Sequence, residues 1–184
     1  MSEHAFELEY WGDCTNTFDE DQKHYVYARF MALPQQHYSF DAGNQRIIDI
    51  GGGPTSMLLK CLNLKGGLVV DPLAYPAWTQ ERYRAKGIQV DQRPGELLTE
   101  TGWDEVWIYN CLQHTEDPEL IIARARGAAP RLRIFEWIDV PAHPGHPHEL
   151  TESVLNRWCH GRGGTVTLQE QGCYGRAWYG VFDL

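Results

Sequence analysis

The sequence predicts an α/β protein with a doubly wound, mostly parallel seven-stranded sheet and an antiparallel C-terminal hairpin strand. Three observations lead to this prediction. Short apolar runs alternate with segments of helical spacing along the chain. A run of three glycines, residues 51–53, directly follows the first apolar run. The last two apolar runs are joined by the turn-rich residues QGCYGR, which favours a hairpin.

The elements follow in a regular order, and alternating strands and helices imply right-handed crossovers with helices on both faces of the sheet. Pro34 and Gly87 end two of the helices, and Thr151 is the expected N-cap of the last helix. We expect strands at residues 46–50, 67–70, 88–90, 105–109, 132–138, 165–170 and 177–182. We expect helices at residues 19–33, 54–62, 77–86, 118–127 and 151–158.

The chain of 184 residues has a length typical of one domain, and no repeat or linker divides it. We therefore expect a single domain over residues 1–184, with a helical N-terminal segment, residues 1–40, before a core of residues 41–184. The net charge of −9 disfavours a nucleic-acid partner, because the overall field repels phosphate backbones.

The composition also predicts a cytoplasmic protein without a membrane span. No apolar run approaches the roughly 18 residues of a spanning helix, and the N-terminus lacks the basic and apolar layout of a signal peptide. The 5 cysteines are widely spread and form no C-x-x-C pair, which favours reduced thiols over a disulfide frame.

The stretch IIDIGGGPTS, residues 47–56, is the first candidate binding site. A cluster of glycines marks a tight turn or a close approach of backbone to a ligand. In a doubly wound sheet, ligands bind at the carboxyl ends of the strands, which is where this turn lies. A dinucleotide site would have the pattern G-x-G-x-x-G, and here its third glycine is missing.

Several motifs occur in a characteristic order. Asp49 to Gly53 has the pattern acid-x-Gly-x-Gly, the second strand ends in Asp71 (LVVDPL), and DEVWIYNCLQHTEDPELII contains the fourth strand and its exit. Over residues 40–184 the chain resembles class I S-adenosylmethionine-dependent methyltransferases, and in particular the ubiquinone-biosynthesis-type small-molecule branch. The resemblance implies a Rossmann-like fold and S-adenosyl-L-methionine as the cofactor. Thr55 stands where the family usually has a third glycine.

The resemblance and the residue chemistry together predict a cofactor site. The bare backbone of the glycine turn can approach the amino acid and ribose parts, and Asp71 can accept hydrogen bonds from the ribose diol. By the resemblance, Glu96 lies where the adenine amino group binds. The plainer alternatives are a simple turn at the glycines, a turn-forming role for Asp71, and a solvated Glu96. The predicted cofactor residues are Asp49, Gly51, Gly52, Gly53, Asp71, Pro72, Glu96, Asn110 and Cys111.

The acceptor side is expected after the fourth and fifth strands. A loop rich in histidine, EWIDVPAHPGHPHEL, is stiffened by three prolines and lies at the carboxyl edge of the sheet. Its H-x-x-H-x-H spacing matches no compact zinc site, so we predict no metal. The predicted catalytic residues are His114, Glu136, His146 and His148.

In the family, N-terminal segments often cover the acceptor as a lid. The predicted substrate residues are Tyr10, Trp11, Tyr25, Arg29 and His143. Structural roles for His114 and for the N-terminal aromatic residues are the alternatives.

The leading functional hypothesis is methyl transfer from S-adenosylmethionine to an oxygen or nitrogen of a small-molecule acceptor by in-line displacement. A lyase or hydrolase of the same cofactor and a non-catalytic cofactor-binding partner subunit are the alternatives. A nicotinamide oxidoreductase is disfavoured by the missing third glycine and by the closing hairpin. The sequence leaves the acceptor and the oligomeric state open.

Overall fold

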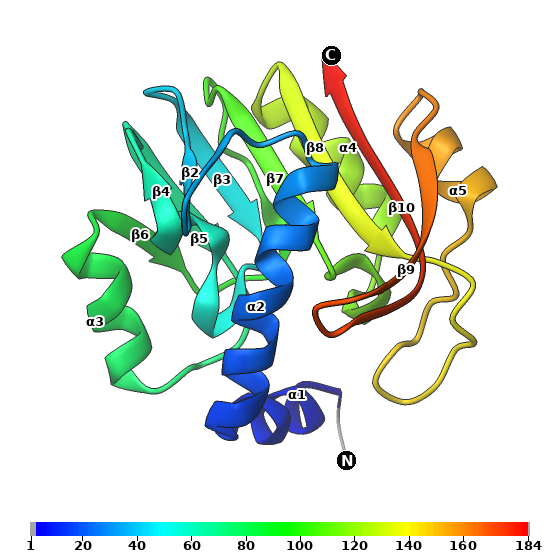
Figure 1. The fold of residues 1–184 in the computed structure, drawn as a ribbon, viewed down its shortest axis with the longest axis horizontal. Coiled ribbons are helices and arrows are strands. Elements are labelled where there is room, and N and C mark those ends of the chain that lie inside the picture. Colours follow the sequence, from blue (N-terminus) through cyan, green and yellow to red (C-terminus); the bar gives the residue numbers. More distant parts are fainter. Residues whose placement is uncertain (1–2, 184) are drawn as a thin grey trace.

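The computed structural model describes residues 3–183, and they form a seven-stranded sheet with the strand order β6-β5-β3-β7-β8-β10-β9. The first five strands in this order are parallel, and β10 is antiparallel to both of its neighbours (Figure 1). The predicted fold class is therefore confirmed. The strands of the sheet are β3 (Arg46–Ile50), β5 (Gly66–Val70), β6 (Ile88–Asp91), β7 (Glu105–Tyr109), β8 (Arg131–Trp137), β9 (Gly164–Glu170) and β10 (Cys173–Asp183).

Helices cover both faces of this sheet, as a doubly wound fold requires. In Figure 1, α2 runs along the front of the sheet, while α4 and α5 lie behind it. The first helix, α1, lies beyond the arrowheads of the central strands, at the edge where their carboxyl ends meet (Figure 1). The helices are α1 (Glu3–Gly12), α2 (Cys14–Phe30), α3 (Ala77–Ala85), α4 (Pro118–Ala128) and α5 (Glu152–Trp158).

The core has two halves because successive side chains of a strand point to opposite faces. In β3, Ile48 and Ile50 pack in the half that contains Ile121 of α4. Ile47 packs in the other half, with Tyr27 of α2. Both faces of β3, β5 and β7 are buried over most of their length, which explains why these strands are largely apolar, with Asp49 and Glu105 as their buried charged residues.

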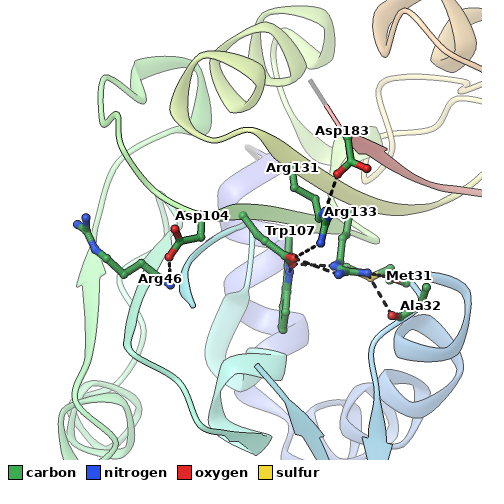
Figure 2. A network of polar contacts seen from close by, with 9 residues as sticks. Met31, Ala32, Arg46, Asp104, Trp107, Arg131, Arg133 and Asp183 are labelled. Atoms are coloured by element: carbon green, nitrogen blue, oxygen red, sulfur yellow. Dashed lines mark hydrogen bonds and ion pairs between the residues drawn. The ribbon is translucent and has the colours of Figure 1, made fainter. Parts of the chain in front are cut away.

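The C-terminal end of α2 is fixed to the sheet by a buried polar network, shown in Figure 2. The guanidinium of Arg133 on β8 donates to the backbone carbonyls of Met31 at 2.7 Å and Ala32 at 3.1 Å. The same guanidinium pairs with the buried carboxylate of Glu105 on β7, which also accepts from the indole of Trp107 at 2.9 Å. These bonds satisfy carbonyls that have no partner within the helix, and they set the position of α2 on the sheet.

The segment after the glycine turn differs from the helix predicted at residues 54–62. Two short 3₁₀ turns, Gly53–Thr55 and Met57–Lys60, take its place and lead into β4 (Cys61–Leu62). The reason is that two tyrosine hydroxyls accept backbone N–H groups here: Tyr83 from Ser56 at 2.9 Å and Tyr109 from Met57 at 2.9 Å. Strand β4 joins β1 (Gln35–Gln36) and β2 (Ser39–Asp41) in a small separate sheet.

Two further differences concern the ends of the chain. The sequence analysis expected a helical N-terminal segment over residues 1–40 but gave no bounds for a helix at the position of α1, and it predicted a longer hairpin turn than the observed one. The turn consists only of Gln171 and Gly172, which both have positive φ (47° and 77°), as a tight two-residue hairpin requires. Among residues 3–183, no helix is both long enough and apolar enough to cross a membrane.

Candidate functional site

The glycine turn after β3 needs glycine at positions 51 and 52 for steric reasons. Gly51 has φ +74°, and a Cβ built on it would lie 2.2 Å from the Sγ atom of Cys111. A Cβ on Gly52 would lie 2.6 Å from a carboxylate oxygen of Asp49. Gly53 also has positive φ, +59°, but its side is open: the nearest atom to a Cβ is the hydroxyl oxygen of Tyr75 at 3.7 Å. The turn therefore presents bare backbone to the space beside Gly53.

Side chains from neighbouring elements hold the turn in place. Asp71, at the end of β5, accepts the backbone N–H of Gly53 and that of Leu73, both at 3.0 Å. The hydroxyl of Tyr83 on α3 donates to the carbonyl of Gly53 at 2.6 Å. A hydrogen-bonded network of this kind rigidifies the turn. Asp71 thus has the turn-stabilising role that the sequence analysis kept as an alternative, and its carboxylate also faces the cleft described below.

Asp49 lies beneath the turn. Its carboxylate is fully buried and accepts hydrogen bonds from the hydroxyls of Ser56 and Tyr109. Burial, with a smaller contribution from the charge of Asp71, raises the pKa of Asp49 to about 7 although the two hydroxyls act in the opposite direction. Asp49 supports the turn from below and does not line the cleft.

A cleft of four adjoining cavities runs along the carboxyl ends of β3, β5 and β7. Gly51, Asn110, His114 and Trp11 each line three of the four, so the cavities are neighbours. We name them by residues that line them. The central cavity contains Gly53, Asp71, Pro72 and Cys111. The Glu96 cavity contains Ile50, Val70, Gly95 and Glu96. The Glu20 cavity contains Glu20, His24, Gly52 and Tyr109. The histidine cavity contains Tyr10, Lys23, Trp137, His143 and His146.

The structure brings together every predicted cofactor residue except Asp49. The residues that line the cleft are Gly51, Gly52, Gly53, Asp71, Pro72, Glu96, Asn110 and Cys111. Glu96 has a second role, because its carboxylate accepts the backbone N–H groups of Glu116 at 3.1 Å and Asp117 at 3.0 Å. Burial raises the pKa of the Cys111 thiol well above its usual range, so this thiol stays protonated and is not a nucleophile.

His114 is held in one orientation by the histidine-rich loop. Its Nδ1 lies 2.7 Å from the backbone carbonyl of Gly145. A carbonyl only accepts, so Nδ1 carries the proton, and in the neutral ring Nε2 is the basic nitrogen. The ring of His146 meets that of His114 edge-on, with centroids 4.5 Å apart. His114 also lines the central and histidine cavities, so it can reach a group bound between them.

The histidine-rich loop is ordered by its own backbone and by a second imidazole. His143 and His146 exchange two backbone hydrogen bonds of 2.9 and 2.8 Å, and their rings are 4.2 Å apart. Nε2 of His148 donates to the carbonyl of Thr115 at 2.7 Å, which ties the loop to the segment between β7 and α4. His148 does not line the four cavities. Among the side chains that the structure describes, no group of three or more His, Cys, Asp or Glu is arranged to hold a metal ion.

Glu136 lies behind the exit of β7. It is fully buried on β8 and accepts the backbone N–H groups of Cys111 and Leu112, each at 3.1 Å. Burial raises the pKa of Glu136 to about 8, although the two N–H groups oppose this shift. It is absent from the walls of the four cavities, so its position supports the backbone at Cys111 and offers no contact with an acceptor.

The predicted substrate residues separate into two groups. Tyr10, Trp11 and His143 line the histidine cavity. Tyr25 lies elsewhere, with its ring against Phe40. Arg29 pairs with Glu170 of β9.

The sequence analysis missed several residues that line the cleft, among them Glu20, Lys23 and His24 on α2 and Trp137 on β8. Glu20, Lys23 and His24 have the i, i+3, i+4 spacing that places side chains on one face of a helix. This spacing could have indicated a polar face on α2. Trp137 ends an apolar strand, and its sequence context carries no comparable signal.

The chain was compared with protein-family models, with curated proteins and with solved structures. No protein-family model and no curated protein matches the chain. Solved structures do match. A magnesium protoporphyrin IX methyltransferase from Synechocystis PCC 6803 with bound S-adenosylmethionine has a TM-score of 0.62 and 14% identity, over 98% of this chain and 97% of that chain. A SAM-dependent methyltransferase from Thermotoga maritima has a TM-score of 0.61 and 14% identity, over 96% and 93% of the two chains.

A third match comes from Haloferax volcanii, in a complex between the Trm112 methyltransferase activator and a putative methyltransferase. It has a TM-score of 0.67 and 10% identity, over 95% of this chain and 94% of that chain. These identities are low, and the likeness extends over nearly the whole chain. The chain therefore has the fold of S-adenosylmethionine-dependent methyltransferases.

Proposed function

We propose that this protein transfers a methyl group from S-adenosylmethionine to an oxygen or nitrogen of a small-molecule acceptor. One observation carries the proposal. On this fold, the bare backbone of Gly51 and Gly53 and the carboxylate of Asp71 line one cavity at the carboxyl edge of the sheet. Ligands of doubly wound sheets bind at this edge.

The chemistry of the cleft fits this cofactor. The Asp71 carboxylate accepts the backbone N–H groups of Gly53 and Leu73 and, at 3.5 Å, the hydroxyl of Tyr75, and it lines the central cavity, where a carboxylate is suited to accept from a ribose diol. The open side of Gly53 leaves space for a ligand where another residue would place its Cβ. Apolar side chains of Ile50, Val70 and Ile121 in the Glu96 cavity suit a planar base.

The same region fits a dinucleotide poorly. Pyrophosphate sites use the N-terminus of an α-helix, where free N–H groups and the helix dipole attract the anion. Here the chain enters short 3₁₀ turns after the glycines, and the N–H of Gly53 is already taken by Asp71. The nearby carboxylates of Asp71 and Glu20 would repel a phosphate. This arrangement favours a cation-bearing nucleoside over a pyrophosphate.

The cofactor supplies a methyl group that is already activated on a sulfonium, so the protein mainly has to orient the acceptor and exclude water. Tyr10, Trp11 and Trp137 give the histidine cavity aromatic walls for a planar acceptor. Nε2 of His114 is the base that takes a proton from the acceptor hydroxyl or amine. His146 and the Gly145 carbonyl hold that ring in place.

Structural neighbours with small-molecule acceptors support the proposal. They include the magnesium protoporphyrin IX methyltransferase and a mitomycin 7-O-methyltransferase. Both of these neighbours are named for a small-molecule acceptor, and the aromatic walls of the histidine cavity fit an acceptor of that class.

The experiment that tests the proposal uses S-adenosylmethionine labelled on the methyl group. The protein is incubated with a panel of aromatic hydroxyl and amine compounds, and the products are identified by mass spectrometry. We expect label in one class of acceptor together with S-adenosylhomocysteine. Cofactor breakdown in the sample without acceptor would instead indicate a lyase or hydrolase. Absence of cofactor binding would contradict the proposal as a whole.

A further inference from the structure

Helix α2 is fixed against the glycine turn at a defined depth. The ammonium of Lys60, which lies after the turn, pairs with the carboxylate of Asp21 at 3.0 Å. The hydroxyl of Thr55, within the turn, donates to the same carboxylate at 3.3 Å. Because Asp21 lies between Glu20 and Lys23 in α2, these bonds determine where the Glu20–Lys23 pair meets the cleft.

Lys23 is the accessible charge of the histidine cavity. Its ammonium lies 3.1 Å from the carboxylate of Glu20, and its side chain is 20% exposed against 8% for that of Glu20. Glu20 also accepts from Nδ2 of Asn110 at 3.1 Å. An ammonium has three N–H donors, and within the described part of the chain the bond to Glu20 uses one of those of Lys23. The charge that a ligand meets in this cavity is therefore positive.

The pairing with Glu20 keeps Lys23 charged and holds its head group in place. Burial acts to lower the pKa of Lys23, but the charge and the hydrogen bond of Glu20 together outweigh this effect and hold the pKa above its usual value. The histidine cavity thus contains a fixed cation at neutral pH.

Gly145 sets the tautomers of two histidines in opposite senses. Its carbonyl accepts from Nδ1 of His114, which leaves Nε2 of His114 as the basic nitrogen. Its backbone N–H donates to Nδ1 of His143 at 3.2 Å, so in the neutral ring Nε2 of His143 carries the proton. Both rings line the histidine cavity. The cavity therefore has a base on His114 and two donors, on His143 and Lys23.

The size and walls of the histidine cavity suit one aromatic ring. Its volume is about 340 Å³, at the lower end of the roughly 300–1,000 Å³ of small-ligand sites. The rings of Tyr10 and Trp11 meet edge-on with centroids 5.0 Å apart. Trp137 packs edge-on against Phe135 at 5.4 Å. These contacts hold the aromatic walls in place for a planar ligand.

We propose that the histidine cavity selects acceptors with an acidic group, in the class of aromatic hydroxycarboxylic and aminocarboxylic acids, and that Lys23 binds the acid group. This inference rests on the proposed function. The cavity adjoins the central cavity through Asn110 and His114, so the acceptor hydroxyl or amine faces the cofactor while the acid group lies toward α2. The acceptor oxygen or nitrogen forms a bond to the methyl carbon as the carbon–sulfur bond breaks with its electrons left on sulfur. The proton goes to Nε2 of His114.

The first measurement is binding, which needs no turnover. The full chain, saturated with S-adenosylhomocysteine, is titrated calorimetrically with the three hydroxybenzoates, the three aminobenzoates and the carboxamide of each. Each acid and its amide have nearly the same size and differ in charge. We expect the wild type to bind the acid of at least one pair about 10–100-fold more tightly than the amide, the range for a hydrogen bond to a charged group.

Four variants assign this preference. Lys23→Met keeps the stem and removes the ammonium, so acid and amide should bind within about twofold of each other. Lys23→Arg keeps the charge and should retain most of the preference. His143→Phe keeps a ring beside His146 and removes a neutral donor, so it should lower the preference by less than Lys23→Met does. Lys86→Met, the control, removes an ammonium from the exposed end of α3 and should leave the preference unchanged.

The second measurement is the position of the transferred methyl group. The pair with the largest preference is incubated with S-adenosylmethionine labelled on the methyl group, and the product is identified by mass spectrometry. We expect a methyl ether or an N-methyl product, because the acid group is held away from the cofactor. A methyl ester would overturn the inference, because the acid group would then face the cofactor.

The outcomes separate this inference from the proposed function. A wild type that does not bind S-adenosylhomocysteine would overturn both. A wild type that binds S-adenosylhomocysteine but binds acids no better than amides would overturn the inference and leave the function standing. A preference for acids that persists in Lys23→Met would also overturn it. Because the preference compares two ligands on one variant, a general loss of stability does not imitate the expected result.

Discussion

The alanine substitution of Gly51 tests the geometry of the turn, because two separate costs act at that position. Gly51 has φ +74°, and a Cβ there would lie 2.2 Å from the Sγ atom and 2.8 Å from the Cβ atom of Cys111. Gly102 provides a matched control. It has nearly the same φ, +73°, but a Cβ built on it has no heavy atom within 4 Å. The difference between Gly51→Ala and Gly102→Ala therefore isolates the collision with Cys111.

The magnitudes follow from these two contributions. An L-residue in the left-handed region costs about 1–2 kcal/mol, and this cost applies to both variants. Overpacking in a buried site costs about 1–3 kcal/mol more, and it applies only to Gly51→Ala. We expect the free energy of unfolding to fall by about 1–2 kcal/mol in Gly102→Ala and by about 2–5 kcal/mol in Gly51→Ala.

Urea unfolding followed by tryptophan fluorescence measures both variants on one scale. A Cys111→Ala background should recover part of the loss in Gly51→Ala, because it removes the Sγ atom that lies closest. The affinity for S-adenosylhomocysteine should fall in Gly51→Ala and stay unchanged in Gly102→Ala. Equal destabilisation of the two glycine variants, without rescue by Cys111→Ala, would refute the close approach of the turn to β7.

Three further predictions concern the carboxylates and the base. Asp71→Asn should weaken S-adenosylhomocysteine binding by about 1.5–3 kcal/mol in a calorimetric titration, because a charge-assisted contact is lost. Asp41→Asn changes another turn-capping aspartate, which accepts the N–H of Gly43 at 2.9 Å away from the cleft, and should have no effect on binding. His114→Gln should lower the turnover number at saturating cofactor by about 10²–10⁴-fold, and unchanged turnover would exclude it as the base. Glu136 has a pKa of about 8 in the folded protein against 4.5 for the ordinary group, so folding favours its protonated form. Stability should therefore fall as the pH rises from about 4.5 to about 8, and this fall should be shallower in Glu136→Gln when urea midpoints are compared across that range.

The order of strands and helices could be predicted because each central strand is a short apolar run bounded by turn residues. Arg46–Ile50 and Glu105–Tyr109 were predicted with the observed bounds. The segment after the glycines was predicted as a helix because it is rich in residues that favour helices, such as Met57, Leu58, Leu59 and Lys60. Its actual form depends on hydroxyls of Tyr83 and Tyr109, which are distant in sequence and cannot be located without the fold.

The candidate site divides in the same way. The glycine turn and Asp71 were found from the sequence because a motif and a position at a strand end indicate them locally. Glu20 and His24 were missed because their contribution depends on how α2 packs against the turn, which Lys60 and Asp21 determine. The burial of Glu136 could not be predicted either, because the sequence of an apolar strand does not show which backbone N–H groups a glutamate within it accepts.

The most direct test of the central claim is a calorimetric titration of the wild-type chain with S-adenosylhomocysteine and, separately, with NAD⁺. If the glycine turn and Asp71 hold S-adenosylmethionine and its thioether product, S-adenosylhomocysteine binds at one site and NAD⁺ does not bind. Binding of NAD⁺ without binding of S-adenosylhomocysteine would contradict the account.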